Sequence, residues 1–274
     1  MSTRDNKIKL FQAHNEASIA AIARTVNAAF SSDPLIQWLR PNAQPWARQN
    51  LNIQKWQHRR VQSIMANGLV FQSYDVSQIA RENPQKGEAR QSSQSSDSSF
   101  GKSAEVSLYE EQAKAAGLED AGAVVFLFPP PGEIGWSFSR TLLKCKIWLL
   151  EIFNPIEDKD CKMERVDLMM SSHTKSLDSL QTEYRQGLWY LEVVAVHPCL
   201  QSRGIGKNVM KWTLDYTRNQ PLYLECTQEG NIRFYESFGF RVVEEMVLTD
   251  ETSHNESATV KLWGMIRTGE DSAQ

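Results

Sequence analysis

The strongest pattern in this chain of 274 residues is an apolar run from Leu188 to Val196, followed by a polar loop and a helical repeat. The run is rich in aliphatic, aromatic and β-branched side chains, as a buried strand would be. Pro198 ends it, because proline has no N–H to donate to a neighbouring strand. Beyond the loop, four apolar residues fall on one face of a helix: Ile205, Val209, Trp212 and Tyr216. We therefore expect a strand, a tight loop and an amphipathic helix in succession.

Weaker patterns of the same two kinds fill the rest of the chain. Short apolar runs predict further strands at residues 8–11, 69–75, 121–128, 222–226, 241–248 and 259–266. Apolar residues at helical spacing predict helices at residues 15–30, 35–39, 46–67, 105–116, 138–153, 164–184 and 231–238. The chain thus mixes strands with helices throughout.

Residues 77–120 differ in composition from the rest of the chain. Within them, residues 91–99 are almost wholly Ser and Gln. So few apolar side chains cannot offset the entropy lost on ordering, and we expect disorder over about residues 80–103. We interpret the stretch as a low-complexity surface insertion, with a phosphorylated regulatory loop as the alternative.

Charge and hydropathy exclude several classes of partner. A net charge of −3 provides no overall basic surface for nucleic acid. The longest apolar run, residues 121–128, is too short to span a membrane, and the first residues lack an apolar signal core. We expect a cytoplasmic or nucleocytoplasmic protein with no nucleic-acid or membrane partner.

The cysteines and histidines predict no metal site. The four cysteines have no C-x-x-C spacing, and the five histidines have no H-E-x-x-H spacing. Cys199 and Cys226 have no evident histidine partner in the sequence, so we do not expect covalent catalysis. Reduced thiols are the favoured interpretation.

The loop Gln201–Gly206 has the composition of an anion-binding turn. The start of a helix leaves its first N–H groups unpaired and carries a partial positive charge. Gly204 and Gly206 would let a phosphate approach the backbone with no Cβ in the way. Arg203 and Lys207 add cationic donors beside the same turn. The loop therefore predicts a phosphorylated ligand, in particular a pyrophosphate.

Two common phosphate-binding motifs do not fit this loop. The P-loop motif needs Ser or Thr after its lysine, but Asn208 follows Lys207. The dinucleotide motif Gly-x-Gly-x-x-Gly lacks its third glycine, because residue 209 is Val. Residues 201–206, Gln-Ser-Arg-Gly-Ile-Gly, instead resemble the loop Gln/Arg-x-x-Gly-x-Gly/Ala of the GCN5-related N-acetyltransferase (GNAT) superfamily. The alternative is an ordinary glycine-bearing turn between a strand and a helix.

A second motif strengthens this resemblance. Residues 231–240 resemble the family's Asn-x-x-x-x-Phe-Tyr type of helix, which closes in Gly-Phe. They differ from that pattern because Asn231 stands four residues before Tyr235. We expect Asn231 to cap the helix and Gly239 to take a positive φ after its last turn.

The resemblance is clear over residues 188–248 and implies a fold for the whole chain. The superfamily has an α/β (α+β) fold: a central mixed, mostly antiparallel, twisted sheet of six to seven strands flanked by helices. A V-shaped splay separates strands four and five. This implies one domain over residues 1–274, with residues 77–120 inserted between strands two and three. Residues 133–185 have room for two helices where the family has one, and we expect substrate specificity to be built there.

The resemblance also implies acetyl-coenzyme A as the cosubstrate, bound in the splay. Its pantetheine arm would pair with the main chain of the fourth strand, and its pyrophosphate would take N–H groups of the loop. The residues that this implicates in cofactor binding are Val194, Ala195, Val196, Gln201, Ser202, Arg203, Gly204, Ile205, Gly206, Lys207, Asn231 and Tyr235.

Direct transfer of an acetyl group needs a neutral amine, a polarised carbonyl and a proton for the leaving thiolate. Tyr235 matches the family tyrosine that often protonates the thiolate, and a phenol is protonated at neutral pH. Glu192 and Glu225 are candidates for the base, although some family members use only a water chain. Because Glu192 alternates with Leu191 and Val193, we expect its side chain to lie on the face opposite to both.

Two functions from different classes follow. The first is an N-acetyltransferase that moves an acetyl group from acetyl-coenzyme A directly to a small-molecule or peptide amine. The second is a non-catalytic acyl-coenzyme A-binding module for sensing or for binding a partner. The intact glycine loop and Tyr235 favour the first, and we expect a monomer or a homodimer.

Overall fold

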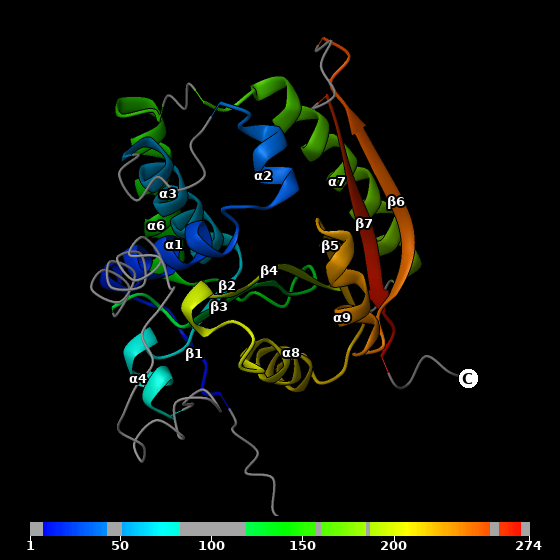
Figure 1. The fold of residues 1–274 in the computed structure, drawn as a ribbon. Coiled ribbons are helices and arrows are strands. Elements are labelled where there is room, and N and C mark those ends of the chain that lie inside the picture. The colour runs from blue at the N-terminus through cyan, green and yellow to red at the C-terminus, as the bar shows by residue number, and fades with distance from the viewer. Residues whose placement is uncertain are drawn as a thin grey trace, which may run out of the picture.

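A computed structural model describes residues 8–42, 51–82, 119–156, 160–184, 187–252 and 258–269 (Figure 1). Its strands form one seven-stranded sheet in the order β1-β2-β3-β4-β5-β7-β6. The strands are β1 (Phe11–Gln12), β2 (Leu69–Gln72), β3 (Ala123–Phe128), β4 (Trp189–Val196), β5 (Leu222–Cys226), β6 (Arg241–Thr249) and β7 (Thr259–Arg267). The α-helices that it describes are α1 (Glu16–Ala29), α2 (Pro34–Leu39), α3 (Leu51–Asn67), α4 (Val76–Glu82), α6 (Phe138–Phe153), α7 (Met163–Glu183), α8 (Ile205–Tyr216) and α9 (Ile232–Glu236).

The sheet is mixed but mostly antiparallel, which confirms the fold class that the resemblance implied. Among the strands described, β4 and β5 pair in parallel, and every other neighbouring pair is antiparallel. Parallel neighbours need a crossover connection, and α8 carries the chain from the end of β4 to the start of β5.

β4 and β5 diverge after a short paired stretch. Residues 189–191 of β4 pair with residues 222–224 of β5, and the ladder ends there. β4 then continues beside β3 as far as Val196, whereas β5 continues beside β7 as far as Cys226. The two strands therefore open into the V-shaped splay expected between strands four and five.

A β-bulge in β4 lies where the strands diverge. Leu191 pairs with Leu127 and Val193 pairs with Phe126, so Glu192 is the extra residue. Leu191 packs in the core formed with α8, but Val193 packs in the core formed with α1 and α3. The expectation that Leu191 and Val193 share a face is therefore wrong, because side-chain alternation holds only along an unbroken ladder.

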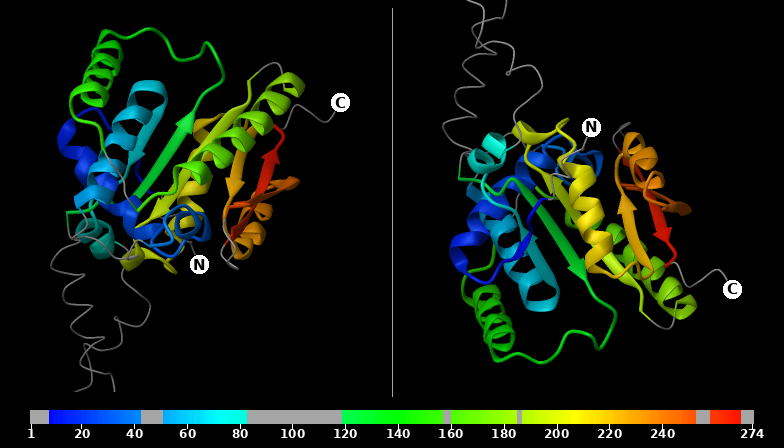
Figure 2. Two further views of the ribbon diagram at one scale, coloured as in Figure 1. Left: turned by 90° about the horizontal axis from the view of Figure 1, so that it is seen from above. Right: turned by 90° about the horizontal axis from the view of Figure 1, so that it is seen from below.

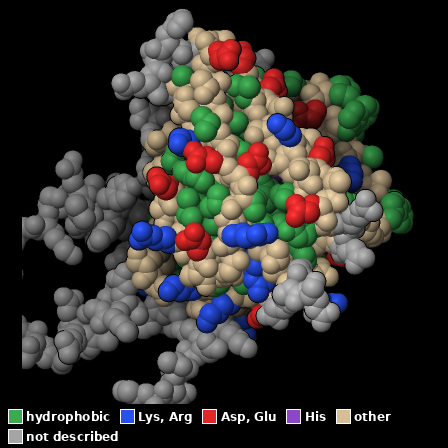
Figure 3. All heavy atoms as spheres, turned by 90° about the vertical axis from the view of Figure 1, so that its right-hand side faces the viewer, with side chains coloured by type: hydrophobic (Ala, Val, Ile, Leu, Met, Phe, Trp, Pro, Cys, Tyr) green, Lys and Arg blue, Asp and Glu red, His purple; other side chains and the backbone are tan. Residues whose placement is uncertain are grey.

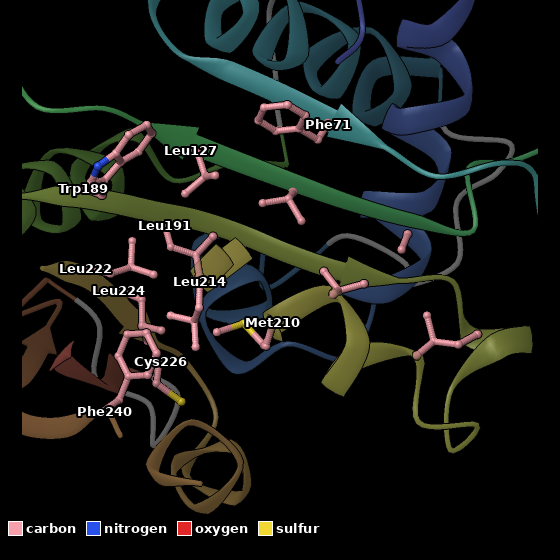
Figure 4. Close-up of a cluster of buried hydrophobic side chains, with 14 of the residues drawn as sticks. Phe71, Leu127, Trp189, Leu191, Met210, Leu214, Leu222, Leu224, Cys226 and Phe240 are labelled. Carbon is pink, nitrogen blue, oxygen red and sulfur yellow. The ribbon is translucent and has the colours of Figure 1, made fainter. Parts of the chain in front are cut away.

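An apolar core covers each face of the sheet. On one face, Met210 and Leu214 of α8 point toward Leu191, Leu222 and Leu224 (Figure 4). On the other face, the buried side chains of α1 and α3 include Ile19, Ile22, Val26, Val61 and Ile64. Burial of apolar side chains on both faces makes the middle strands the most apolar part of the chain.

The two helices expected between β3 and β4 are both present, but they have different neighbours. α7 packs Leu177 and Leu180 against the buried Tyr223 and Ile266. α6 packs on α3 and has no fully buried residue. Figure 2 shows α6 at the edge of the molecule beside α3, with α7 at the other side next to β6 and β7.

The ends of the stretch 77–120 lie side by side. The Val76 N–H donates to the Asp120 carbonyl at 3.0 Å, and the Ser73 N–H donates to the Ala123 carbonyl at 2.9 Å. This geometry suits an insertion into the connection between β2 and β3. The sequence did not predict α4, which buries Ile79 in the core. Disorder was expected from about residue 80, but residues 80–82 form the end of α4, so the prediction is wrong there. The rest of the expected disorder, up to residue 103, and the expected helix at 105–116 lie outside the described residues.

β6 forms one edge of the sheet. Its exposed valines, with 40–52 % of their surface accessible, are Val242, Val243 and Val247. Acidic and basic side chains are interspersed with apolar ones over this face (Figure 3). Glu245 pairs here with Lys261 of β7 at 2.7 Å, and charged side chains of this kind disfavour edge-to-edge association.

Candidate active site

The open edge of β4 presents main-chain groups to the splay. The His197 N–H donates to the Gly122 carbonyl at 2.9 Å, on the β3 side. Successive residues of a strand direct their N–H and C=O groups to alternate sides, so Ala195 also faces β3, and Val194 and Val196 face the splay. An extended ligand could pair with Val194 and Val196 as an added strand would.

The loop after β4 has the backbone geometry that anion-binding turns use. Ser202 and Gly204 have positive φ angles of 62° and 79°, and Gly204 immediately precedes α8. The first N–H groups of α8 have no earlier carbonyl within the helix to bond. The Gln201 side-chain amide donates to the Val196 carbonyl at 3.1 Å, which ties the loop to the splay. These residues could hold a phosphate group at the wide end of the splay.

A side chain would have different effects at the two loop glycines. A Cβ on Gly204 would meet nothing within 4 Å, so its positive φ is what favours glycine there. A Cβ on Gly206 would lie 3.7 Å from Phe234 Cζ and 3.9 Å from Val196 Cγ2. Gly206 therefore lines the narrow space between the loop, α9 and the end of β4, where a larger side chain would compete with a ligand.

The other loop residues differ in the groups that they can offer. Ile205 is 3 % exposed and packs in the core, so only its main chain could meet a ligand. Ser202 and Lys207 are exposed, and Arg203 is partly buried. Backbone N–H groups are therefore the main groups that the loop could offer to a phosphate, and the cationic side chains of Arg203 and Lys207 would supplement them.

His197 anchors the start of this loop. Its Nε2 lies 3.5 Å from Asp120 Oδ2, and Asp120 also accepts a hydrogen bond from Arg24 at 2.5 Å. Burial alone would lower the pKa of His197, but hydrogen bonding with Asp120 and Cys199 and the charge of Asp120 outweigh it and raise the pKa to about 9. The imidazolium is thus a buried structural cation at neutral pH.

Tyr235 lies on α9, packed edge to face against Phe234 and Phe240 at ring-centroid distances of 5.3 and 5.9 Å. Burial, with smaller contributions from Cys226 and Asp33, raises the pKa of Tyr235. The phenol therefore keeps its proton throughout the neutral range. Its hydroxyl has no hydrogen-bond partner among the residues that the structure describes, so its proton is available to a ligand.

Asn231 does not cap α9 as expected. It has φ −89° and ψ −10° and ends a short 3-10 helix, residues 229–231, that runs directly into α9. An N-cap residue needs an extended backbone to turn its side chain onto the helix start, and this backbone is helical. The Asn231 amide instead donates to the Gln228 side chain at 3.3 Å. Gly239 has φ 85°, which confirms its expected role at the helix end.

A cavity of about 540 Å³ lies on the α1 and α3 face of the sheet, beside the narrow end of the splay. Its walls come from α1, α2, α3, α7, β4 and β5. The ionisable residues that line it are Arg24, Asp33, Arg40, Arg60, His173, Tyr190, Glu192 and Glu225, and its larger apolar ones include Phe30, Trp56, Phe128, Met169, Met170 and Leu177. The cavity combines an apolar body with a cluster of charges.

Glu192 and Glu225 both line this cavity, immediately after the last paired residues of β4 and β5. Glu192 Oε1 accepts hydrogen bonds from Arg60 Nη2 at 2.6 Å and from Arg60 Nε at 3.2 Å. Trp56 lies beside the guanidinium of Arg60, with 5.6 Å between Cζ and the ring centroid. This carboxylate is therefore neutralised by a fixed cation.

Glu225 has different neighbours. Its Oε1 lies 2.9 Å from His173 Nδ1 and 3.3 Å from the Tyr223 hydroxyl, and its Oε2 lies 3.4 Å from the Tyr190 hydroxyl. The His173 ring packs on Tyr190 with 4.9 Å between the centroids. Burial alone would lower the pKa of His173, but the hydrogen bond and charge of Glu225, with the charge of Glu192, raise it above its usual value.

Asp33 closes the cavity at the start of α2. It caps the helix, accepting hydrogen bonds from Leu35 N–H and Ile36 N–H at 3.0 and 3.2 Å. Its other oxygen accepts a short hydrogen bond from Thr227, just beyond β5. Burial raises the pKa of Asp33 despite these bonds.

The sequence predicted the two carboxylates but not His173, Arg60 or Thr227. These residues belong to no motif, and each lies far along the chain from the carboxylate that it contacts. The sequence indicated only the region from which such residues would come, because residues 133–185 were expected to determine substrate specificity. Helix α7 of this region contributes five cavity residues: Met169, Met170, His173, Leu177 and Gln181.

Within the described parts of the chain, no helix is long and apolar enough to cross a membrane. The same parts contain no group of three or more His, Cys, Asp or Glu side chains placed to hold a metal ion.

Comparison with known proteins agrees with this architecture. Residues 174–240 match the model of the acetyltransferase (GNAT) family. No curated protein sequence matches the chain. Arylalkylamine N-acetyltransferase 2 from Aedes aegypti is 12 % identical, with 96 % of this chain and 99 % of that chain covered at a TM-score of 0.54.

Two further solved structures are comparably similar. One is described as histone acetyltransferase HPA2 and related acetyltransferase from Corynebacterium glutamicum: 12 % identity, 98 % of this chain and 99 % of that chain covered, TM-score 0.51. The other is the C-terminal condensation domain of Ebony: 8 % identity, coverage of 95 % and 98 %, TM-score 0.53. At such identities the likeness concerns the fold, which is the one that the resemblance to the GNAT superfamily implied, and residues 174–240 match the model of that family.

Proposed function

We propose that this protein transfers an acetyl group from acetyl-coenzyme A directly to an amine bound in the cavity. The divergence of β4 and β5 is the observation that carries this proposal, because it has an anion-binding loop at its wide end and an ionisable cavity at its narrow end. A cosubstrate paired with Val194 and Val196 would run from the loop toward Glu192. Its thioester would then meet an acceptor held in the cavity.

The residues support three parts of direct transfer: binding of the acceptor, protonation of the thiolate and positioning of the reactants. The cavity carboxylates Asp33 and Glu225 would attract an ammonium group, and the apolar walls would hold the rest of the acceptor. Tyr235 would donate its proton to the leaving thiolate. Holding both reactants at the narrow end of the splay would supply much of the rate enhancement by proximity.

A non-catalytic acyl-coenzyme A-binding module is the second candidate. Such a module would need the loop and the splay but not a lined cavity beside the thioester. The charged cavity of about 540 Å³ therefore favours the enzyme.

Binding and turnover separate the two functions. We expect calorimetry to detect acetyl-coenzyme A binding, and release of free coenzyme A thiol to depend on a member of a panel of primary amines. Binding without turnover on any amine would favour the module. Absence of binding at millimolar coenzyme A would contradict both functions.

A further inference from the structure

We propose that His173, oriented by Glu225, is the general base that accepts the proton of the attacking amine. This inference rests on the proposed acetyl transfer. It assigns different tasks to the two glutamates that the sequence alone left equivalent.

The geometry of His173 is that of an oriented base. Its side chain comes from α7, with 20 % of its surface exposed, and its Nδ1 lies 2.9 Å from Glu225 Oε1. A carboxylate at Nδ1 requires a proton there, which leaves Nε2 as the acceptor nitrogen of the neutral ring. Nε2 has no hydrogen-bond partner among the described residues, and His173 lines the cavity.

Tyr190 and Glu225 together fix the ring. Tyr190 packs against one side of His173 and also donates toward Glu225 Oε2 at 3.4 Å. Glu225 is 13 % exposed and directly follows Leu224, the last residue of β5 that pairs with β4. The imidazole is therefore held next to the narrow end of the splay, where a thioester and an amine would meet.

Glu192 is the weaker candidate on the same grounds. It receives two hydrogen bonds from Arg60 on one oxygen. Its Oε1 is already engaged by the guanidinium, so Arg60 competes with an amine for this oxygen. Glu192 and Arg60 thus form a paired wall of the cavity, whereas His173 keeps an open acceptor.

The proposed step conserves atoms and charge. The lone pair of the neutral amine attacks the thioester carbonyl, and a proton of the amine passes to His173 Nε2. The carbon–sulfur bond then breaks, and the thiolate takes the Tyr235 proton. The products are the amide and free coenzyme A, after which the histidine returns its proton to solvent and the tyrosine regains one.

The charged and titratable groups facing His173 determine its pH dependence. They are Glu225, Tyr190 and Glu192, with Arg60 bonded to Glu192 and Tyr223 bonded to Glu225. The base works only when neutral, so kcat/KM should rise with pH through the raised pKa of His173. Removing the Glu225 charge lowers that pKa, so the acidic limb should move to lower pH.

The test uses the full chain with an amine that the wild type turns over. We expect His173→Gln to lower kcat by about 10²–10⁴-fold, the usual value of general base catalysis. Acetyl-coenzyme A affinity by calorimetry should change less than twofold. His58→Gln is the matched control, because it removes a half-buried histidine of α3 that does not line the cavity.

Glu225→Gln supplies an independent readout that does not depend on the histidine variant folding. Its acidic limb of kcat/KM should lie at lower pH than that of the wild type. A His173→Gln variant with kcat within about threefold of wild type, or an unmoved acidic limb in Glu225→Gln, would overturn the inference while leaving acetyl transfer intact. A wild type that binds acetyl-coenzyme A but acetylates no amine would overturn both.

Discussion

The loop at residues 201–207 and the cavity lie at opposite ends of the same splay, yet they are built in opposite ways. The loop is a contiguous segment whose ligand groups are mainly backbone N–H groups, positioned by Gly204 and the start of α8. The cavity has side chains from α1, α2, α3, α7, β4 and β5, brought together by the tertiary fold. One of its polar contacts, between Arg60 and Glu192, joins residues that are 132 positions apart in the sequence.

This contrast separates two kinds of sensitivity to mutation. A backbone site is damaged by added volume or by a changed φ, but tolerates changes in exposed side chains. A side-chain site is damaged by loss of one functional group even when volume is conserved. Substitutions at each end of the splay, and at places outside it, test the distinction.

The largest expected effect is at Tyr235. Tyr235→Phe removes the hydroxyl and keeps the ring packed on Phe234 and Phe240. If this hydroxyl protonates the thiolate, kcat should fall by about 10²–10⁴-fold with little change in coenzyme A affinity. Rates should be measured where chemistry is limiting; a kcat within about threefold of wild type would remove Tyr235 from the mechanism.

The next effect tests the backbone site. Gly206→Val should weaken coenzyme A binding by roughly 100-fold, because its branches would occupy the space beside Phe234 and Val196 and cost one or two hydrogen bonds to a charged phosphate, each about 1.5–3 kcal/mol. Gly206→Ala is the matched control, since its Cβ meets only ordinary contacts. Calorimetry on both should separate them; equal affinities would show that the loop does not hold the pyrophosphate.

A smaller effect concerns the anchor of the loop. His197 has a pKa of about 9 in the folded protein and about 6.5 unfolded, so its stabilising contribution is present below pH 6.5 and is lost as pH rises through 9. The free energy of unfolding should fall by about 2–3 kcal/mol over this range. Urea unfolding at several pH values measures this, and His197→Gln should flatten the dependence. An equal slope in that variant would assign the loss to other groups.

The smallest effect is expected outside both sites, on α6. Trp148 is 64 % exposed, so Trp148→Ser should change the free energy of unfolding by no more than about 0.5 kcal/mol. Ile147→Ala on the half-buried side of the same helix should cost more, because it removes apolar contact from a partly buried position. Denaturant unfolding of both variants gives the comparison, and a larger loss for Trp148→Ser would mean that this face is covered in solution.

α6 and α7 show what helical periodicity leaves undecided. Both helices were predicted from apolar spacing, and both begin and end within two residues of the predicted bounds. The pattern says that a helix has an apolar face, but the neighbour of that face depends on the path of the chain after β3. α7 lines the cavity, whereas α6 packs on α3 and leaves most of its apolar residues exposed.

The sequence by itself determined the features that depend on neighbouring residues. These were the strand, loop and helix around Gly204, the positive φ of Gly239 and the sheet class implied by two local motifs. Each follows from backbone sterics, helix-end hydrogen bonding or apolar periodicity, which act over a few residues. Asn231 does not cap α9, because the 3-10 helix at residues 229–231 gives it a helical backbone. The sequence pattern did not predict that 3-10 helix.

Only the tertiary structure decided the chemistry of the cavity. The register of β3 and β4 shifts between Phe126 and Leu127, which leaves Glu192 as an extra residue in β4. From this bulge onward, the side chains of β4 alternate between the two faces of the sheet in the opposite order. Glu192 consequently lies beside Arg60. Glu225 of β5 lies beside His173, which belongs to α7 in the enlarged region. The hydrogen-bond partners and charges within a few ångströms decide what a carboxylate can do in a site. Two glutamates that look alike along the chain therefore acquire different chemistry, because distance in space, and not along the sequence, selects their partners.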